Sequence, residues 1–173
     1  MLITLRDTTV DLRQPRPNDG AAIWALVRDT GVLDLNSPYA YFLLGEHLAE
    51  TCVVAEREGE IVGFVSAYIP PKTPDSVFVW QVGVASSMRK QGLAMQMLLA
   101  LLQREACRDV RSMTTTITPS NLASRALFAG LADRVGAQLQ ERPEHFPVDW
   151  FPVEGHEAES LFTISPIARE RTA

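Results

Sequence analysis

The stretch from 77 to 107 limits the possible folds more than any other part of the chain. An apolar run rich in valine, VFVWQVGVA, comes directly before two cations, a glycine and a helical pattern, SSMRKQGLAMQMLLALLQREAC. This order predicts a buried strand that turns into a helix from about Gly92 to Cys107. A strand followed by a helix of this length is typical of folds in which helices cover a sheet.

Hydrophobic periodicity and turn or cap residues predict the other elements. Before the stretch come a strand at 10–13, a helix over 19–30 ended by Gly31, a helix beginning at Ser37-Pro38, and a hairpin of TCVVAE and IVGFVSAY with Gly59 in its turn. After it come a strand MTTTIT, a helix from Ser120 or Asn121 to about Val135, a short run AQLQE, an irregular segment RPEHFPVDWFPVEG and a last strand SLFTIS. The order β-α-α-β-β-β-α-β-α-β-β predicts an α/β (α+β) layer around a mixed sheet.

Length and composition favour a single domain of common size spanning residues 1–173. The chain has 46% apolar residues, and no linker or repeat divides it. A net charge of −5 argues against nucleic-acid binding, which favours a basic face. Because the sequence has no membrane-length apolar run and no signal-peptide pattern, we expect a cytoplasmic protein with no membrane partner.

The cysteines and histidines do not suggest a metal site. Cys52 and Cys107 are isolated in apolar stretches, which favours buried, unbridged thiols in a reducing compartment. The three histidines do not cluster, so no metal is expected.

The junction at Gly92 has the parts of a phosphate site. The start of a helix presents backbone N–H groups without partners, and its dipole makes that end positive. Gly92 permits a tight turn, Ala94 leaves room near the backbone, and Arg89 and Lys90 add positive charge. A plain connector whose charges face water explains the same residues, and the motif alone leaves the two interpretations about even.

A wider resemblance favours the phosphate site. VGVASSMRKQGLAMQML resembles the acetyl-CoA segment of the GNAT superfamily of N-acetyltransferases, whose pattern Arg/Gln-x-x-Gly-x-Gly/Ala is matched by Arg89, Gly92 and Ala94. The resemblance implies acetyl-CoA as cosubstrate, with its pyrophosphate on the loop amides and its pantetheine arm paired with the preceding strand. The implied cofactor residues are Val82, Gly83, Val84, Arg89, Lys90, Gln91, Gly92, Leu93, Ala94 and Asn121.

The same resemblance implies a three-layer fold. Its central sheet is mixed and mostly antiparallel, has about six to seven strands, is splayed between the fourth and fifth strands, and is flanked by about four helices. Many relatives have a tyrosine where this chain has Phe128, whose ring cannot protonate the leaving thiolate. Either another donor serves, or the thiolate leaves unassisted. Phe128 is equally compatible with core packing.

Three stretches resemble a narrower family, the L-2,4-diaminobutyrate acetyltransferases of ectoine biosynthesis. They are LDLNSPYAYFLL, FVWQVGV and VEGHEAESLFTISP, and the similarity extends to TITPSNLASRALF. It implies acetylation of the γ-amino group of a small diamino acid, giving N4-acetyl-L-2,4-diaminobutyrate for osmoadaptation. A homodimer is the expected assembly.

Five residues are candidates for binding the acceptor: Asp34, Tyr39, Trp80, His156 and Glu159. Each also has an ordinary structural explanation. Asp34 can form an Asx turn or cap a helix, Tyr39 and Trp80 can be surface or core aromatics, and His156 can be a solvated loop residue.

His156 and Glu159 are also the candidates for taking the proton of the amine, directly or through water. Residues three apart face opposite sides of a regular strand. Both can therefore line one pocket only if Gly155 to Ala158 is bent or precedes the strand. If the strand is regular, Glu157 is the alternative.

Direct transfer is preferred over an acyl-enzyme because no cysteine or serine has a triad-like setting. A backbone N–H near Val82 is the expected donor to the thioester oxygen. Two alternatives stay open: acetylation of another small amine, a polyamine or a protein N-terminus, and a coenzyme A-binding sensor without catalysis.

Overall fold

The computed structural model describes residues 1–6, 8–152 and 154–168. The chain forms two compact units, one made of Met1–Tyr68 and Val79–Asp109, the other of Ile69–Phe78 and Val110–Ala173. Strand β5 (Ser76–Val84) contributes residues to both units. Neighbouring strands follow the order β1-β2-β3-β4-β5-β6-β8-β7.

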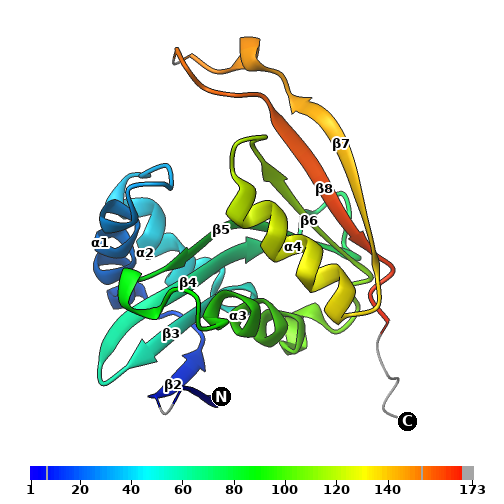
Figure 1. The fold of residues 1–173 in the computed structure, drawn as a ribbon. Coiled ribbons are helices and arrows are strands. Elements are labelled where there is room, and N and C mark those ends of the chain that lie inside the picture. The colour runs from blue at the N-terminus through cyan, green and yellow to red at the C-terminus, as the bar shows by residue number, and fades with distance from the viewer. Residues whose placement is uncertain (7, 153, 169–173) are drawn as a thin grey trace. The chain divides into compact units, whose positions relative to one another are not determined.

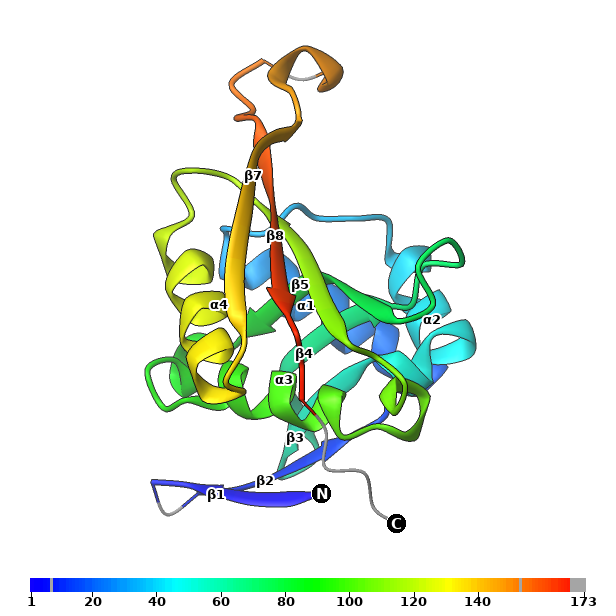
Figure 2. The same ribbon diagram turned by 90° about the vertical axis from the view of Figure 1, so that its right-hand side faces the viewer.

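The first unit contains a mostly antiparallel set of strands and three helices (Figures 1 and 2). Strands β1 to β4 pair antiparallel, each with the next. The elements are β1 (Leu2–Leu5), β2 (Thr8–Arg13), α1 (Gly20–Thr30), α2 (Pro38–His47), β3 (Val53–Arg57), β4 (Glu60–Tyr68), the larger part of β5, and α3 (Leu93–Leu102).

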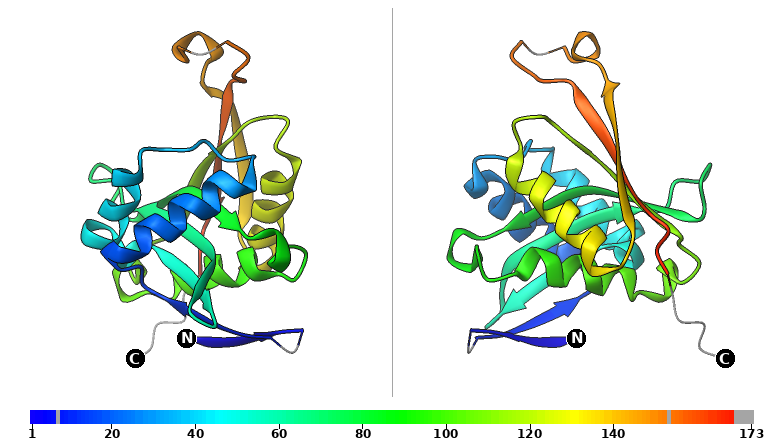
Figure 3. Two further views of the ribbon diagram at one scale, coloured as in Figure 1. Left: turned by 90° about the vertical axis from the view of Figure 1, so that its left-hand side faces the viewer. Right: turned by 45° about the vertical axis from the view of Figure 1, so that its right-hand side comes forward.

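Helices cover both faces of the strands in this unit. Phe64 of β4 belongs to a buried cluster with Ile23 of α1 and Tyr41 of α2. A Cβ on the neighbouring Gly63 would instead lie 3.0 Å from Met97 of α3. Because successive residues of a strand face opposite sides, α1 and α2 share one face and α3 covers the other. Figure 3 shows α1 and α2 side by side.

Local signals place these elements as expected. Gly31 ends α1 in the left-handed region, with φ of 64°. Ser37 caps α2, since its side chain accepts a bond from the N–H of Tyr39 and Pro38 occupies the first turn. Glu58 and Gly59 both have positive φ, 53° and 85°, as a two-residue hairpin turn requires. These predictions are confirmed.

The second unit contains a hairpin of long strands with one helix packed against it (Figure 2). Its elements are the start of β5, β6 (Ser112–Ile117), α4 (Leu122–Arg134), β7 (Gln138–Phe146) and β8 (Glu159–Ser165). β8 pairs antiparallel with both β6 and β7. The parallel β5–β6 ladder joins only Ser76–Phe78 to Ser112–Thr114, the pattern expected of two strands that splay.

Three parts of the sequence-based prediction are wrong. The described residues contain eight strands, because a first strand β1 was missed and β2 begins earlier, at Thr8. The helix predicted to reach Cys107 ends at Leu102, since Arg104 is extended and only a 3₁₀ turn follows. The segment RPEHF lies within β7, although its pairing with β8 shifts register between Arg142 and Phe146; its mostly exposed, polar side chains conceal the alternation that identifies a strand.

Both cysteines are buried and not disulfide-bonded, as predicted. Burial raises the pKa of Cys52 to about 11. Among the described residues, no helix combines the length and apolar character that a membrane crossing needs.

Candidate active site

The junction between β5 and α3 leaves backbone N–H groups open. Lys90 and Gly92 both have positive φ, 59° and 83°, so the chain turns sharply before the helix begins. The first bond of the helix runs from the N–H of Gln96 to the carbonyl of Gly92. The N–H groups of the residues between them, Leu93 to Met95, therefore have no partner inside the helix. These groups can donate hydrogen bonds to an anion.

Two side chains of the junction bind the junction itself. Arg89 donates from Nε to the carbonyl of Val84 at 3.3 Å, and Gln91 donates from Nε2 to the carbonyl of Ser87 at 3.0 Å. Both contacts hold the loop in shape. This geometry favours the interpretation in which the backbone N–H groups would bind a phosphate directly and the side-chain charges would contribute less to its binding.

The two faces of β5 serve different purposes. Gln81 and Gly83 face α1 and α2, since Gln81 bonds to Tyr41 and a Cβ on Gly83 would meet Phe64 and Leu26. Trp80 faces the other side and is 44% exposed. The alternative of a core tryptophan is therefore wrong, and an aromatic face is available on this strand.

Gly83 is required by close packing in the first unit. A Cβ there would lie 2.9 Å from Cδ1 of Phe64 and 3.2 Å from Cδ2 of Leu26. The Phe64 ring also meets Tyr41 edge-on, at a centroid distance of 6.3 Å. Gly83→Ala is therefore expected to displace Phe64 and lower the free energy of unfolding by about 1–3 kcal/mol, as overpacked cores do.

Chemical denaturation would measure that loss, and Gly63→Ala is the matched control. The nearest atoms to a Cβ on Gly63 belong to the end of the Met97 side chain, at 3.0 and 3.1 Å, and methionine adapts easily. The control should lose less stability. Equal losses in the two variants would contradict the packing argument.

Asp34 lies in the loop between α1 and α2, with its side chain exposed. It does not cap α2, because Ser37 does. The backbone carbonyl of Asp34 instead accepts a bond from Nε2 of Gln81 at 2.8 Å. Tyr39 is 66% exposed at the start of α2, so it is a surface aromatic and not a core one.

The turn before β8 fulfils the condition for His156 and Glu159. Gly155 has φ of 84°, and β8 begins only at Glu159. Residues 156–158 therefore precede the strand. Glu157 accepts bonds from the N–H and the hydroxyl of Ser120. The alternative in which Glu157 takes the role depended on a regular strand, and residues 156–158 do not form one.

The ring of His156 has a defined orientation. It stacks on Phe151, with centroids 3.7 Å apart and planes 8° apart. Its Nδ1 lies 2.7 Å from the carbonyl of Glu157. A carbonyl only accepts, so Nδ1 carries the hydrogen, and Nε2 is the nitrogen that can take a proton when the ring is neutral.

Asn121 begins α4 beside the same turn. Its side-chain oxygen accepts the N–H of Ser124 at 3.0 Å, which is the predicted cap. Because the preceding Ser120 binds Glu157, the start of α4 and the turn before β8 lie together. Phe128, further along α4, is buried and belongs to the core.

His145 was missed because it lies in the segment taken as irregular. Arg142 contacts its Nδ1, and an arginine can only donate, so this nitrogen accepts. Burial and the Arg142 charge lower the pKa of His145, while Glu159 raises it. His145 thus contacts Arg142 and lies close enough to Glu159 to interact with its charge. A sequence signal for it was lacking.

The candidate residues fall into two groups, one in each unit. The first unit holds Asp34, Tyr39, Trp80 and the junction around Gly92, whereas the second holds Asn121, His156 and Glu159. The described residues contain no cluster of three or more potential metal ligands.

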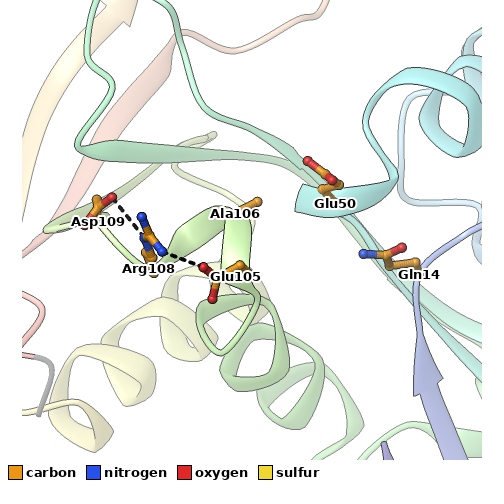
Figure 4. A pocket seen from close by; sticks show the side chains of 6 residues that line it. All are labelled: Gln14, Glu50, Glu105, Ala106, Arg108 and Asp109. Atoms are coloured by element: carbon orange, nitrogen blue, oxygen red, sulfur yellow. Dashed lines mark hydrogen bonds and ion pairs between the residues drawn. The ribbon is translucent and has the colours of Figure 1, made fainter. Parts of the chain in front are cut away.

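A separate hollow of about 340 Å³ in the first unit contains none of the candidates (Figure 4). One side of it is lined by an exposed ion-pair group in which Arg108 contacts Glu105 at 2.8 Å and Asp109 at 3.4 Å. Its lining residues are Gln14, Glu50, Glu105, Ala106, Arg108 and Asp109. The ion pairs explain the arrangement without a ligand.

Comparison with known proteins adds to this geometry. Residues 21–131 match the family model described as Acetyltransferase (GNAT) family. The chain is 53% identical over 156 residues to the L-2,4-diaminobutyric acid acetyltransferase of Bordetella parapertussis, covering 90% of this chain and 83% of the relative. It is 49% identical over 156 residues to the enzyme of the same name from Marinococcus halophilus, covering 90% of each chain.

Solved structures show the same similarity. A diaminobutyrate acetyltransferase, EctA, from Paenibacillus lautus, in complex with its substrate L-2,4-diaminobutyric acid and coenzyme A, superposes with a TM-score of 0.89 at 48% identity. The match covers 94% of this chain and 98% of that one. Ard1 from Thermoplasma volcanium, at 16% identity and a TM-score of 0.69, shares the fold, with 93% of this chain and 99% of that one covered.

Proposed function

Because this chain belongs to the GNAT family of acetyltransferases, we propose that it transfers the acetyl group of acetyl-CoA to the γ-amino group of L-2,4-diaminobutyrate. The observation that carries this conclusion is similarity along almost the whole chain to an enzyme solved with that substrate and coenzyme A. The product is N4-acetyl-L-2,4-diaminobutyrate, an intermediate of ectoine biosynthesis. The enzyme is an acyltransferase that needs no metal.

The proposed donor site is the junction around Gly92. The open N–H groups of Leu93 to Met95 hold the pyrophosphate, with the adjoining amides of Gln91 and Gly92. Arg89 and Lys90 add positive charge near it. Strand residues Val82, Gly83 and Val84 pair with the pantetheine arm, and Asn121 contacts the cofactor from the start of α4.

The proposed acceptor site uses Asp34 for an ammonium group and Trp80 for the aliphatic chain, by packing and cation–π contact. Tyr39 adds a second aromatic surface. An alkylammonium is almost fully protonated at pH 7, so a base must remove a proton before attack. We assign this to Glu159 or to His156, acting through water.

Transfer then proceeds in one complex. The neutral nitrogen attacks the thioester carbon, a nitrogen–carbon bond forms, and the carbon–sulfur bond breaks. The carbonyl oxygen gains negative charge, which a backbone N–H near Val82 stabilises. The base passes the ammonium proton to solvent and then takes the second proton of the attacking nitrogen. The thiolate leaves unassisted and is protonated by solvent, because Phe128 has no hydroxyl to give.

The proposal extends to the domain organisation, location and assembly of the enzyme. The two units act as one N-acetyltransferase domain over residues 1–173, since β5 belongs to both and the family match spans both. The unbridged buried thiols favour a cytoplasmic location. A homodimer is the commonest assembly for such enzymes. Osmotic stress is the physiological setting of the product.

Release of the coenzyme A thiol tests the proposal. The purified protein is incubated with acetyl-CoA and a panel of amines: L-2,4-diaminobutyrate, its shorter and longer diamino acid homologues, putrescine, and a peptide with a free N-terminus. We expect diaminobutyrate to give the highest kcat/KM. A higher kcat/KM for a polyamine or the peptide would show that diaminobutyrate is not the preferred acceptor. Coenzyme A binding without thiol release would indicate a sensor without catalysis.

A further inference from the structure

Gln81 is a polar side chain inside an apolar strand. It is only 7% exposed, and its backbone N–H donates to the hydroxyl of Ser66 at 3.0 Å. A buried carboxamide is costly unless its donors and acceptor are satisfied. Its side chain must therefore have partners, and those partners lie in a segment far away in the chain.

Both ends of the carboxamide hold the loop between α1 and α2. Nε2 donates to the carbonyl of Asp34 at 2.8 Å, and Oε1 accepts from the hydroxyl of Tyr41 at 3.3 Å. The Tyr41 oxygen in turn accepts from the N–H of Asn36 at 3.3 Å. The backbone is thus fastened to β5 on both sides of Leu35.

The anchors are themselves rigid. Tyr41 is buried and meets Phe64 edge-on, at 86° between ring planes. Gln81 also adjoins Trp80 in sequence, so the strand residue that presents the aromatic face and the residue that fixes the loop are neighbours. The side chains of these two neighbours face opposite sides of β5, so the two hydrogen bonds of Gln81 set the loop position relative to the strand itself.

We propose that Gln81 is a positioning residue for acceptor specificity. It holds the Asp34 backbone so that the exposed Asp34 carboxylate stays at a fixed place, ready for the ammonium group. This rests on the proposed function, since it assigns Asp34 to the acceptor. Gln81 itself does not touch the reacting atoms.

Gln81→Glu tests the proposal with almost no change in shape. The introduced carboxylate can still accept from Tyr41 but cannot donate to the Asp34 carbonyl. We expect the KM for diaminobutyrate to rise about 10-fold, the loss expected when a buried carbonyl is left without its donor. The KM for acetyl-CoA should change little, whereas the thermal unfolding temperature should fall, because the variant buries a carboxylate and leaves a carbonyl without its donor.

The pH dependence of the KM for diaminobutyrate distinguishes a positioning role of Gln81 from a general loss of structure in the variant. The protonated carboxylic acid can donate to the Asp34 carbonyl, and burial raises the pKa of a carboxyl group above its ordinary range. The ratio of variant to wild-type KM for diaminobutyrate should therefore be smallest at acid pH and grow as pH rises. A purely structural defect would not follow the ionisation of the introduced group.

Gln103→Glu is the matched control, because Gln103 is exposed after α3 and the same charge is added there. Its kinetics should equal those of the wild type. Tyr41→Phe serves as a second variant if Gln81→Glu does not fold; it removes the contact with Asn36 and should also raise the diaminobutyrate KM alone.

Two results overturn the inference. One is a wild-type diaminobutyrate KM in Gln81→Glu, or in Tyr41→Phe where that variant replaces it. The other is an equal rise in the KM of both substrates. In either case wild-type turnover of diaminobutyrate would leave the proposed function intact. A wild-type protein that acetylates no diamino acid would instead remove the proposed function.

Discussion

Glu159→Gln is expected to lower kcat for diaminobutyrate by about 10²- to 10⁴-fold, the usual contribution of a positioned general base. The amide has nearly the same shape but cannot accept the proton of the ammonium group. Coenzyme A binding should stay close to wild type, because the donor site lies at the junction around Gly92. Steady-state kinetics with a separate coenzyme A titration measures the two quantities.

The neighbouring glutamate provides the matched control. Glu157 binds Ser120 beside the start of α4, so Glu157→Gln should affect turnover far less. His156→Ala tests the other candidate, whose Nε2 is the nitrogen that can take a proton. Unchanged turnover in both Glu159→Gln and His156→Ala would refute the base assignment, and a loss in Glu157→Gln alone would move it to that residue.

Gly92→Asp is expected to raise the KM for acetyl-CoA at least about 10-fold, through backbone strain at a positive φ and through the added charge. Gly92 has φ of 83°, and no atom lies within 4 Å of the place of a Cβ. Steric overlap is therefore excluded as the cause. The carboxylate would stand where the pyrophosphate is proposed to bind, so repulsion adds to the strain.

Gly92→Asn separates charge from strain, because asparagine adopts the left-handed region more readily than most residues and carries no charge. Its acetyl-CoA KM should lie between those of the wild type and Gly92→Asp. Salt should reduce the difference between the two variants, since screening weakens charge repulsion. Equal acetyl-CoA KM values in the two variants would argue against an anion site here.

Sequence reasoning succeeded where a conformation depends on neighbouring residues. Gly31 ends α1, Ser37 caps α2, Gly59 turns the hairpin, and Asn121 caps α4. Each of these depends on a φ angle or a side chain bonding to nearby backbone, which a few adjacent residues decide. Gly92 is the same kind of signal, and it located the proposed donor site.

Sequence reasoning failed where a segment is stabilised by distant partners. β1 is a strand because it pairs with β2, and β7 extends to Phe146 because it pairs with β8. β7 is largely exposed, so its side chains lack the apolar alternation that marks a half-buried strand. His145 lies in this strand and was therefore not among the residues that the sequence suggested for the site.

The sequence by itself determined the family, the order of most elements, and the strand-to-helix junction proposed to hold phosphate, because these depend on residue patterns that are local in the chain. Only the tertiary structure decided why Gly83 lacks a side chain and what Gln81 does. The Phe64 ring occupies the space beside Gly83. Gln81 binds the Asp34 carbonyl from 47 residues away. Contacts of this kind depend on how strands and helices pack, and the residues next to them in sequence do not encode them.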